Sequence, residues 1–183
     1  MPVPSGCQQA SNTRAREVNN MKTLLVLRHA KSSWKHDALD DHDRPLNKRG
    51  KKAAPLMGQL LTRQNAVPDL ILSSTAKRAR ATAKRVVKAM GYEGQIIYEQ
   101  TMYLAEPGAY LKAIRDHAET HERVLIIGHN PGLEALVQAM TGTDQPLPTA
   151  ALAEIQLTIQ SWKGLKRTTK GKLLNLWLPR NLE

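Results

Sequence analysis

The sequence predicts an α/β fold with a mainly parallel sheet covered by helices on both faces, as in a three-layer α/β/α sandwich. Short aliphatic runs alternate with longer amphipathic segments along most of the chain. The aliphatic runs are continuous rather than interrupted by polar residues, which is typical of strands buried on both faces. The alternation of strand and helix favours parallel strands joined by helical crossovers.

The first half of the chain contains two predicted strands and two predicted helices. Thr23–Leu27 is a short aliphatic run and is expected to form a buried strand. Asn47 can cap a helix that runs to about Leu61. A second buried strand is expected over Asp69–Ser73, followed by a helix over Thr75–Met90. Gly91 follows this helix and is expected to end it.

The second half continues the alternation and then ends in two strands. Pro107 suits the first turn of a helix, because its fixed φ angle is pre-organised for that position. Arg123–Gly128 is the clearest buried strand, and the two last segments alternate enough to form an edge hairpin. The expected elements are a strand at 95–98, a helix at 107–118, a strand at 123–128, a helix at 131–140, and strands at 151–159 and 172–178.

The composition excludes several classes of protein. The chain has 183 residues, which fits one domain with a full core. No apolar run approaches the ~18 residues that a spanning helix needs, so we expect no membrane segment. The scarcity of cysteine fits a reducing compartment, so we expect a cytoplasmic location. The single cysteine, Cys7, excludes an intrachain disulfide and a cysteine-rich zinc site. Aromatic residues make up only 4% of the chain, which argues against a stacking surface for single-stranded nucleic acid.

The charge of the chain favours anionic partners. Lys and Arg number 27 against 16 Asp and Glu, giving a formal net charge of +11. This excess does not choose among phosphate groups, acidic proteins and nucleic acids. The first 20 residues carry no periodic apolar pattern and no hydrophobic signal segment. We therefore expect a disordered extension over residues 1–20 and the folded domain over residues 21–183.

Basic residues and histidines gather just beyond the ends of three predicted strands. Arg28 and His29 follow the first strand, and His129 lies in the turn after the strand at 123–128. Arg78 and Arg80 lie in the first turn of the helix that follows the second strand. Ligands of open α/β sheets bind at the carboxyl ends of the strands, where helix N-termini also supply N–H groups. The sequence therefore predicts an anion pocket, with phosphate as the expected anion.

Two histidines in a phosphate pocket indicate phosphoryl transfer. A neutral imidazole can attack phosphorus and carry the phosphoryl group covalently. Guanidinium groups would neutralise the phosphoryl oxygens, which is most of the catalytic task. A single histidine at a strand end is more often an ordinary hydrogen-bonding residue. Two histidines at equivalent strand ends favour the catalytic interpretation.

Several segments, in the same order along the chain, resemble the histidine phosphatase superfamily, also called phosphoglycerate mutase-like. Within it they resemble the short SixA-like phosphohistidine phosphatases. The resemblance covers residues 21 to about 178 and implies a phosphoglycerate mutase-like fold. The segments are Leu27-Arg28-His29-Ala30-Lys31-Ser32-Ser33-Trp34, Asp43-Arg44-Pro45-Leu46 with Arg49-Gly50, Ser73-Ser74-Thr75-Ala76-Lys77-Arg78-Ala79-Arg80-Ala81-Thr82, Gly128-His129-Asn130-Pro131 and Pro148-Thr149-Ala150-Ala151.

The resemblance also implies roles for individual residues. His29 would be the phosphorylated nucleophile, with Arg28, Arg78 and His129 forming the rest of the phosphate-binding pocket. Arg80 does not match the catalytic arginine and is expected to be a solvated helix charge. An acidic residue after the third strand protonates the leaving group in much of the superfamily. Glu106 is the nearest candidate for that acid, although a carboxylate there also suits the start of the next helix.

These expectations combine into a phosphatase that needs neither metal nor cofactor and works through a phosphohistidine intermediate. Its expected substrate is protein phosphohistidine. Two alternatives remain open: a phosphatase for small phosphate monoesters, and a noncatalytic module that binds phosphorylated or nucleic-acid ligands. His117 and His121 lie four residues apart but have no evident third ligand, so a solvated helix face is expected there rather than a metal site. The expected partners are phosphorylated proteins or small phosphate esters, with nucleic acid and membrane not expected.

Overall fold

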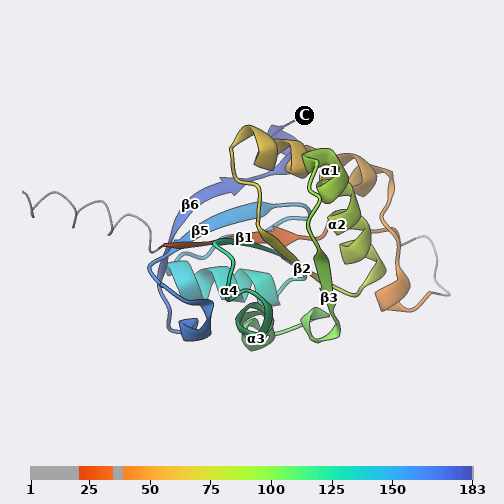
Figure 1. Cartoon of the computed structure of the whole chain (residues 1–183). Helices are drawn as coiled ribbons and strands as arrows, with labels where there is room; N and C mark the ends of the chain where they lie inside the picture. Colours follow the sequence, from red (N-terminus) through yellow and green to blue (C-terminus); the bar gives the residue numbers. More distant parts are fainter. Residues whose placement is uncertain (1–20, 35–38, 183) are drawn as a thin grey trace, which may run out of the picture.

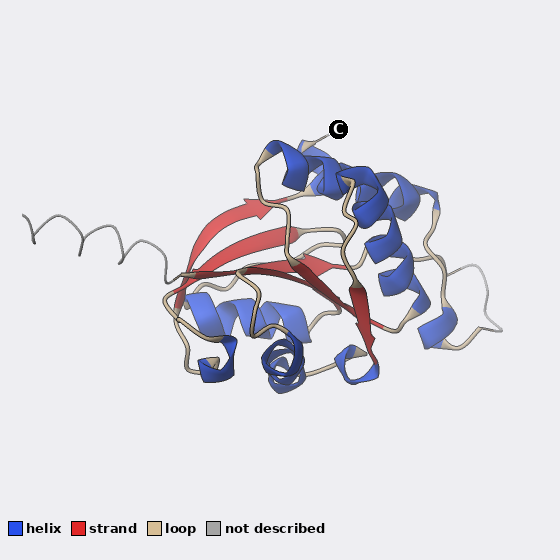
Figure 2. Cartoon of the chain, in the orientation of Figure 1, coloured by secondary structure: helices blue, strands red, loops and turns tan. Residues whose placement is uncertain are grey.

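The computed structural model describes residues 21–34 and 39–182, so the expected extension over residues 1–20 lies outside the described part of the chain. One six-stranded sheet lies between two layers of helices (Figures 1 and 2). This arrangement confirms the predicted three-layer sandwich. None of the described helices is long and apolar enough to cross a membrane.

The sheet is mainly parallel, as the sequence predicts. Its strand order is β3-β2-β4-β1-β5-β6. The first four strands in this order pair in parallel, whereas β5 and β6 add to the edge beside β1 as an antiparallel hairpin. The strands are β1 Lys22–Arg28, β2 Leu70–Ser74, β3 Ile96–Glu99, β4 Arg123–Gly128, β5 Leu152–Leu157 and β6 Gly171–Trp177.

Local signals at the helix ends act as predicted. The Asn47 side chain accepts a hydrogen bond from the Gly50 N–H at 2.9 Å, which caps the first helix. Gly91 ends the second helix with a φ of 67°, a left-handed conformation that glycine adopts without steric cost. The second helix begins at Lys77 rather than Thr75, because β2 continues through Ser74. The helices are α1 Lys48–Arg63, α2 Lys77–Met90, α3 Pro107–His117 and α4 Gly132–Thr141.

Alternate residues of each central strand face opposite layers of the sandwich. In β1, Leu25 and Leu27 belong to the hydrophobic cluster that α1 and α2 cover, whereas Leu24 and Val26 belong to the cluster that α3 and α4 cover. Figure 1 shows α1 and α2 on one side of the sheet and α3 and α4 on the other. Both faces of the central strands are therefore buried, which explains their continuous aliphatic runs.

The register brings the ends of three central strands to one place. Strand β4 lies between β1 and β2, with Arg28 opposite Gly128 and Ser73 opposite Ile127. The segments that follow these strands therefore begin side by side at the carboxyl edge of the sheet. A crevice for ligands is expected at this edge.

Candidate active site

A cavity of about 340 Å³ opens at the carboxyl ends of β1, β2 and β4. We call it the histidine cavity, because it contains both histidines that the sequence places at strand ends. The structure brings His29, Arg28, Arg78 and His129 together there, as the sequence predicts. Its lining residues are Arg28, His29, Lys31, Ser32, Trp34, Asp41, Arg44, Arg78, Leu104, His129, Asn130 and Thr149.

The backbone around the two histidines holds their rings close together. The His29 N–H donates to the Gly128 carbonyl at 3.1 Å, which ties the end of β1 to the residue before His129. The two imidazole ring centroids lie 5.0 Å apart. On the other side, the Ala30 N–H donates to the Thr82 hydroxyl at 3.0 Å, and that hydroxyl donates to the Arg78 carbonyl at 2.7 Å. Strand β1 and helix α2 are thus linked beside the cavity.

His29 is held as a neutral imidazole with one nitrogen facing the cavity. Burial, reinforced by nearby arginine charges, lowers its pKa from 6.5 to about 4. Its Nδ1 lies 2.8 Å from the Ala30 carbonyl oxygen, which can only accept, so Nδ1 carries the proton. The lone pair therefore sits on Nε2, which lies 3.3 Å from Nε of Arg78. A lone pair on a neutral nitrogen beside a guanidinium is poised for attack on a bound anion.

His129 is also neutral but is oriented differently. Burial and the neighbouring charges lower its pKa from 6.5 to about 3. Its Nε2 lies 2.8 Å from the Ser74 hydroxyl, and its Nδ1 lies 3.4 Å from Nη2 of Arg78. Because Arg78 can only donate, Nδ1 is the acceptor and Nε2–H donates to Ser74. The hydrogen bond to Ser74, the last residue of β2, therefore fixes the orientation of the His129 ring.

Two close backbone approaches fix the turn that carries His129. The Tyr110 hydroxyl accepts a hydrogen bond from the His129 N–H at 3.0 Å. A Cβ added at Gly128 would lie 2.4 Å from that hydroxyl oxygen, and one at Gly132 would lie 1.8 Å from the Ala105 carbonyl oxygen. Only glycine fits at these two positions, so the Gly-His-Asn-Pro-Gly turn can pack directly against α3 and the segment before it.

Arg78 lies between the two histidines and is positioned by Asp41. Its side chain donates from Nη2 to the Asp41 carboxylate at 2.8 Å and from Nη1 to the Asp41 carbonyl. Asp41 begins the short 3-10 turn η2 (Asp41–Asp43) and also accepts from Arg44 Nη1 at 2.8 Å and from the Tyr103 hydroxyl at 2.7 Å. Partial burial raises the pKa of Asp41, but these three donors outweigh it and hold the pKa far below its usual range. Asp41 is therefore an ionised anchor for Arg78 and cannot supply a proton at neutral pH.

Further donors line the cavity on the side of β1. Arg28 donates from Nη1 to the Leu147 carbonyl at 2.8 Å, which fixes its side chain against the loop before β5. Its buried Nε has no hydrogen-bond partner among the described residues. A buried donor without a partner is costly unless a ligand accepts from it. Lys31 and Arg44 add two further positive charges to the lining.

The electrostatic balance of the cavity suits a phosphate group. Four basic side chains and one carboxylate line it, and both histidines are uncharged. Guanidinium groups match the geometry of phosphate oxygens and keep their charge at all ordinary pH values. The cavity can therefore bind a phosphoryl group with the lone pair of His29 Nε2 facing it.

Glu106 is not brought into the cavity. It is exposed at the N-terminal boundary of α3, makes no side-chain cap there, and is absent from the cavity lining. The carboxylate that does line the cavity is Asp41, in a segment that the sequence analysis treats only as part of a resemblance. The motif around Asp43-Arg44-Pro45 was the available signal, but it could not show that Asp41 turns inward. Arg80, as expected, is exposed and does not line the histidine cavity.

The two histidines that lie four residues apart, His117 and His121, have different surroundings. His117 Nε2 lies 2.7 Å from a Glu99 carboxylate oxygen, whereas His121 forms no ion pair with a carboxylate among the described residues. No group of three or more His, Cys, Asp or Glu residues that could hold a metal occurs within residues 21–34 and 39–182. His117 therefore has a carboxylate partner, whereas Nδ1 of His121 is buried without a hydrogen-bond partner among the described residues.

Comparison with known proteins identifies the family of the chain. The model of the family "Histidine phosphatase superfamily (branch 1)" matches residues 24–103. An uncharacterised chloroplastic protein of Arabidopsis thaliana is 32% identical over 151 residues, which cover 78% of this chain and 69% of that protein. The family match includes most of β1 and all of α2, which line the histidine cavity.

Two solved structures share the fold over nearly their whole length. A candidate phosphohistidine phosphatase SixA from Agrobacterium tumefaciens is 32% identical, with a TM-score of 0.74, and the match covers 86% of this chain and 98% of that one. A second candidate phosphohistidine phosphatase SixA, from Nakamurella multipartitia, is 26% identical with a TM-score of 0.72, and the match covers 87% of this chain and 96% of that one. The fold is therefore that of the SixA-like branch.

Proposed function

The chain belongs to the histidine phosphatase superfamily, and on this premise we propose that it removes phosphoryl groups from protein phosphohistidine through a phosphohistidine intermediate on His29. The observation that carries the proposal is the state of His29. Its Nδ1 proton is directed to the Ala30 carbonyl, so the lone pair lies on Nε2, which accepts from Nε of Arg78 at 3.3 Å in the wall of a cavity lined by basic side chains. This is the arrangement that a nucleophilic imidazole needs.

The proposed reaction has two displacement steps. In the first, Nε2 of His29 bonds to phosphorus, and the bond between phosphorus and the substrate nitrogen breaks. Arg28 and Arg78 hold the phosphoryl oxygens while their charge is redistributed, and His129 supports the pocket through its contact with Arg78. In the second, water attacks phosphorus, the bond to His29 breaks, and inorganic phosphate leaves. The basic side chains supply the positive charge, so we propose that the reaction needs no metal ion or cofactor.

The described lining of the histidine cavity holds no placed acid, which favours a nitrogen-bound phosphoryl group. Asp41 is ionised, Glu106 lies outside the cavity, and both histidines are neutral with low pKa values. An imidazole leaving group has a pKa near 6.5 and can take its proton from water. The alkoxide of a serine-type ester is far more basic and needs an acid worth about a hundred- to ten-thousandfold in rate. Phosphohistidine is therefore the better substrate for this set of side chains.

The mouth of the cavity favours a macromolecular substrate. Trp34 and Leu104 line the cavity, yet their exposed fractions are 72% and 57%. The guanidinium carbon of Arg44 lies 3.2 Å from the Trp34 ring centroid, which holds the ring beside the opening. Exposed apolar side chains beside a charged cavity are typical of surfaces that contact another protein. We extend the proposal to a cytoplasmic enzyme that acts on phosphorylated proteins.

Labelling of the intermediate tests the proposal directly. We expect radioactive phosphate from a phosphohistidine substrate to appear on wild-type protein in an acid-labile, base-stable linkage at His29. His29→Ala should lose the label and reduce turnover by about a thousandfold or more, because the covalent step is removed. Turnover should be the same with and without a chelator. Label on a residue other than His29, or activity restored to chelated protein by a divalent ion, would contradict the proposal.

A further inference from the structure

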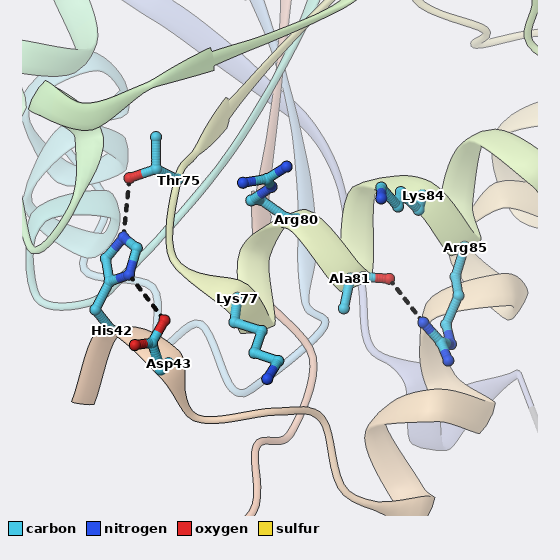
Figure 3. Close-up of a pocket in the computed structure, with 8 residues that line it drawn as sticks. All are labelled: His42, Asp43, Thr75, Lys77, Arg80, Ala81, Lys84 and Arg85. Atoms are coloured by element: carbon cyan, nitrogen blue, oxygen red, sulfur yellow. Dashed lines mark hydrogen bonds and ion pairs between the residues drawn. The ribbon is translucent and has the colours of Figure 1, made fainter. Parts of the chain in front are cut away.

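A second cavity, of about 420 Å³, lies beside the histidine cavity and is not used by the proposed reaction. We call it the basic groove. Figure 3 shows α2 along one wall, carrying most of the basic side chains, and the η2 turn with His42 and Asp43 on the other. The groove is lined by His42, Asp43, Thr75, Lys77, Arg80, Ala81, Lys84 and Arg85.

The helical repeat places the cations of the groove on one face of α2. Lys77, Arg80 and Lys84 follow the spacing i, i+3, i+7, which keeps them on the same side of a helix. All three are exposed, whereas the opposite face of α2 packs into the hydrophobic core. The row from Lys77 to Arg85 extends over roughly 12 Å along the helix axis.

The charges of the groove are not neutralised within the described structure. Lys77, Arg80, Lys84 and Arg85 make no ion pair with a carboxylate among the described residues. The one carboxylate in the lining, that of Asp43, lies 3.5 Å from Nδ1 of His42. Cations three and four residues apart repel each other, and the first turn of α2 contains no acidic residue to complement the helix dipole. An anionic ligand would relieve both unfavourable interactions.

The groove and the histidine cavity share a wall. Asp41 faces the histidine cavity, and the next two residues of the same turn, His42 and Asp43, line the groove. The Tyr103 ring connects the two sides, because its centroid lies 4.9 Å from that of His42 and 5.5 Å from that of His129. A ligand in the groove therefore lies within a few residues' length of a phosphoryl group bound at His29.

We propose that the basic groove binds a short acidic segment of the protein substrate while the adjacent phosphohistidine enters the histidine cavity. This inference rests on the proposed function. An extended chain advances about 3.3 Å per residue, so the row of cations matches roughly four residues. The groove thereby selects phosphoproteins that carry Asp or Glu close to the phosphorylated histidine.

A protein ligand fits the groove better than a nucleic acid. Single-stranded nucleic acids bind to proteins by stacking bases on exposed aromatic rings. One aromatic ring near the groove, that of Tyr98, is already covered by the Arg80 guanidinium, 4.8 Å from the ring centroid, and another, that of Tyr103, packs against His42. Asp43 in the opposite wall would also repel a continuous phosphate backbone. These features favour a short segment with separate carboxylates.

Matched peptides test the inference. Two peptides with the same phosphohistidine are compared, one flanked by four Glu residues and the other by four Gln residues. We expect wild-type protein to turn over the Glu peptide with a KM about tenfold lower, and the preference to shrink as salt rises. The Lys77→Gln/Lys84→Gln variant should lose about three- to tenfold of this preference. Lys88→Gln removes the same charge from the same helix outside the groove, and should keep the full preference.

Equal KM values for the two peptides in wild-type protein, or an equal loss of preference in Lys88→Gln, would overturn the inference. Fluorescence anisotropy of a labelled, unphosphorylated Glu peptide gives a readout that does not depend on turnover. Stronger binding of a single-stranded oligonucleotide at the same residues would instead assign the groove to nucleic acid. If neither peptide is turned over but the Glu peptide still binds, and binds more weakly to Lys77→Gln/Lys84→Gln, the proposed function fails while the binding of an acidic segment in the groove is retained.

Discussion

The histidine cavity and the basic groove lie on either side of the η2 turn and both use basic residues of α2, but they hold their cations differently. Arg78, 3% exposed, is bound by Asp41 and lies against both histidines. Lys77 and Lys84 are exposed and have no acidic partner among the described residues. A charge fixed in a buried position stabilises one geometry of a reacting group. Exposed lysines keep the side-chain freedom needed to follow ligands of variable sequence.

The largest expected effect comes from loosening the fixed arginine while keeping its charge. Arg78→Lys retains a cation but loses the planar group that contacts Asp41, His29 and His129 together. We expect kcat/KM for phosphohistidine to fall by about a hundred- to thousandfold. Steady-state kinetics of this variant and of Lys88→Gln provide the measurement. A similar, small change in both variants would mean that charge alone matters in the histidine cavity.

A second test uses the buried histidines, for which the groove has no counterpart. His29 and His129 have folded-state pKa values of about 4 and about 3, below the unfolded value of 6.5. Between pH 6.5 and 4 the unfolded chain binds more protons, so stability is full above pH 6.5 and falls as the pH is lowered. His29 alone should contribute a loss of about 3 kcal/mol by pH 4.

Chemical denaturation at several pH values measures this loss. The free energy of unfolding of wild-type protein should decrease steadily from pH 7 to pH 4.5, and His29→Gln should flatten part of the slope. If wild-type protein had the same unfolding free energy at pH 7 and pH 5, the two imidazoles would not be held neutral by the fold.

The smallest expected effects come from substitutions of two carboxylates, one that lines the histidine cavity and one that lies outside it. Asp41→Asn removes the charge that anchors Arg78 and Arg44, so we expect a loss of about ten- to a hundredfold in kcat/KM.

Glu106→Gln should change kcat/KM by less than about twofold for both phosphohistidine and an alkyl phosphate, because Glu106 lies outside the cavity. A selective loss of alkyl phosphate turnover in Glu106→Gln would restore Glu106 as the acid.

Local sequence features determined most of the fold and the core of the site. Continuous aliphatic runs such as Arg123–Gly128 mark strands buried on both faces, and Asn47 and Gly91 mark helix ends by their own backbone chemistry. Parallel strands place their carboxyl ends together, so the residues that follow them had to meet. His29 and His129 were therefore predictable from their positions alone, without knowledge of any long-range contact.

Only the tertiary structure decided the partners of those residues. The direction of the Asp41 carboxylate depends on how the segment after β1 folds back against α2, which no local pattern encodes. The same holds for the exposure of Glu106 and for the Arg78 and Ser74 contacts that place the His129 proton on Nε2. The separation of Arg78 from Lys77 and Lys84 likewise depends on which face of α2 meets the sheet. Burial and hydrogen-bond geometry arise from contacts between distant segments, so charge, tautomer and role are set only when the chain is folded.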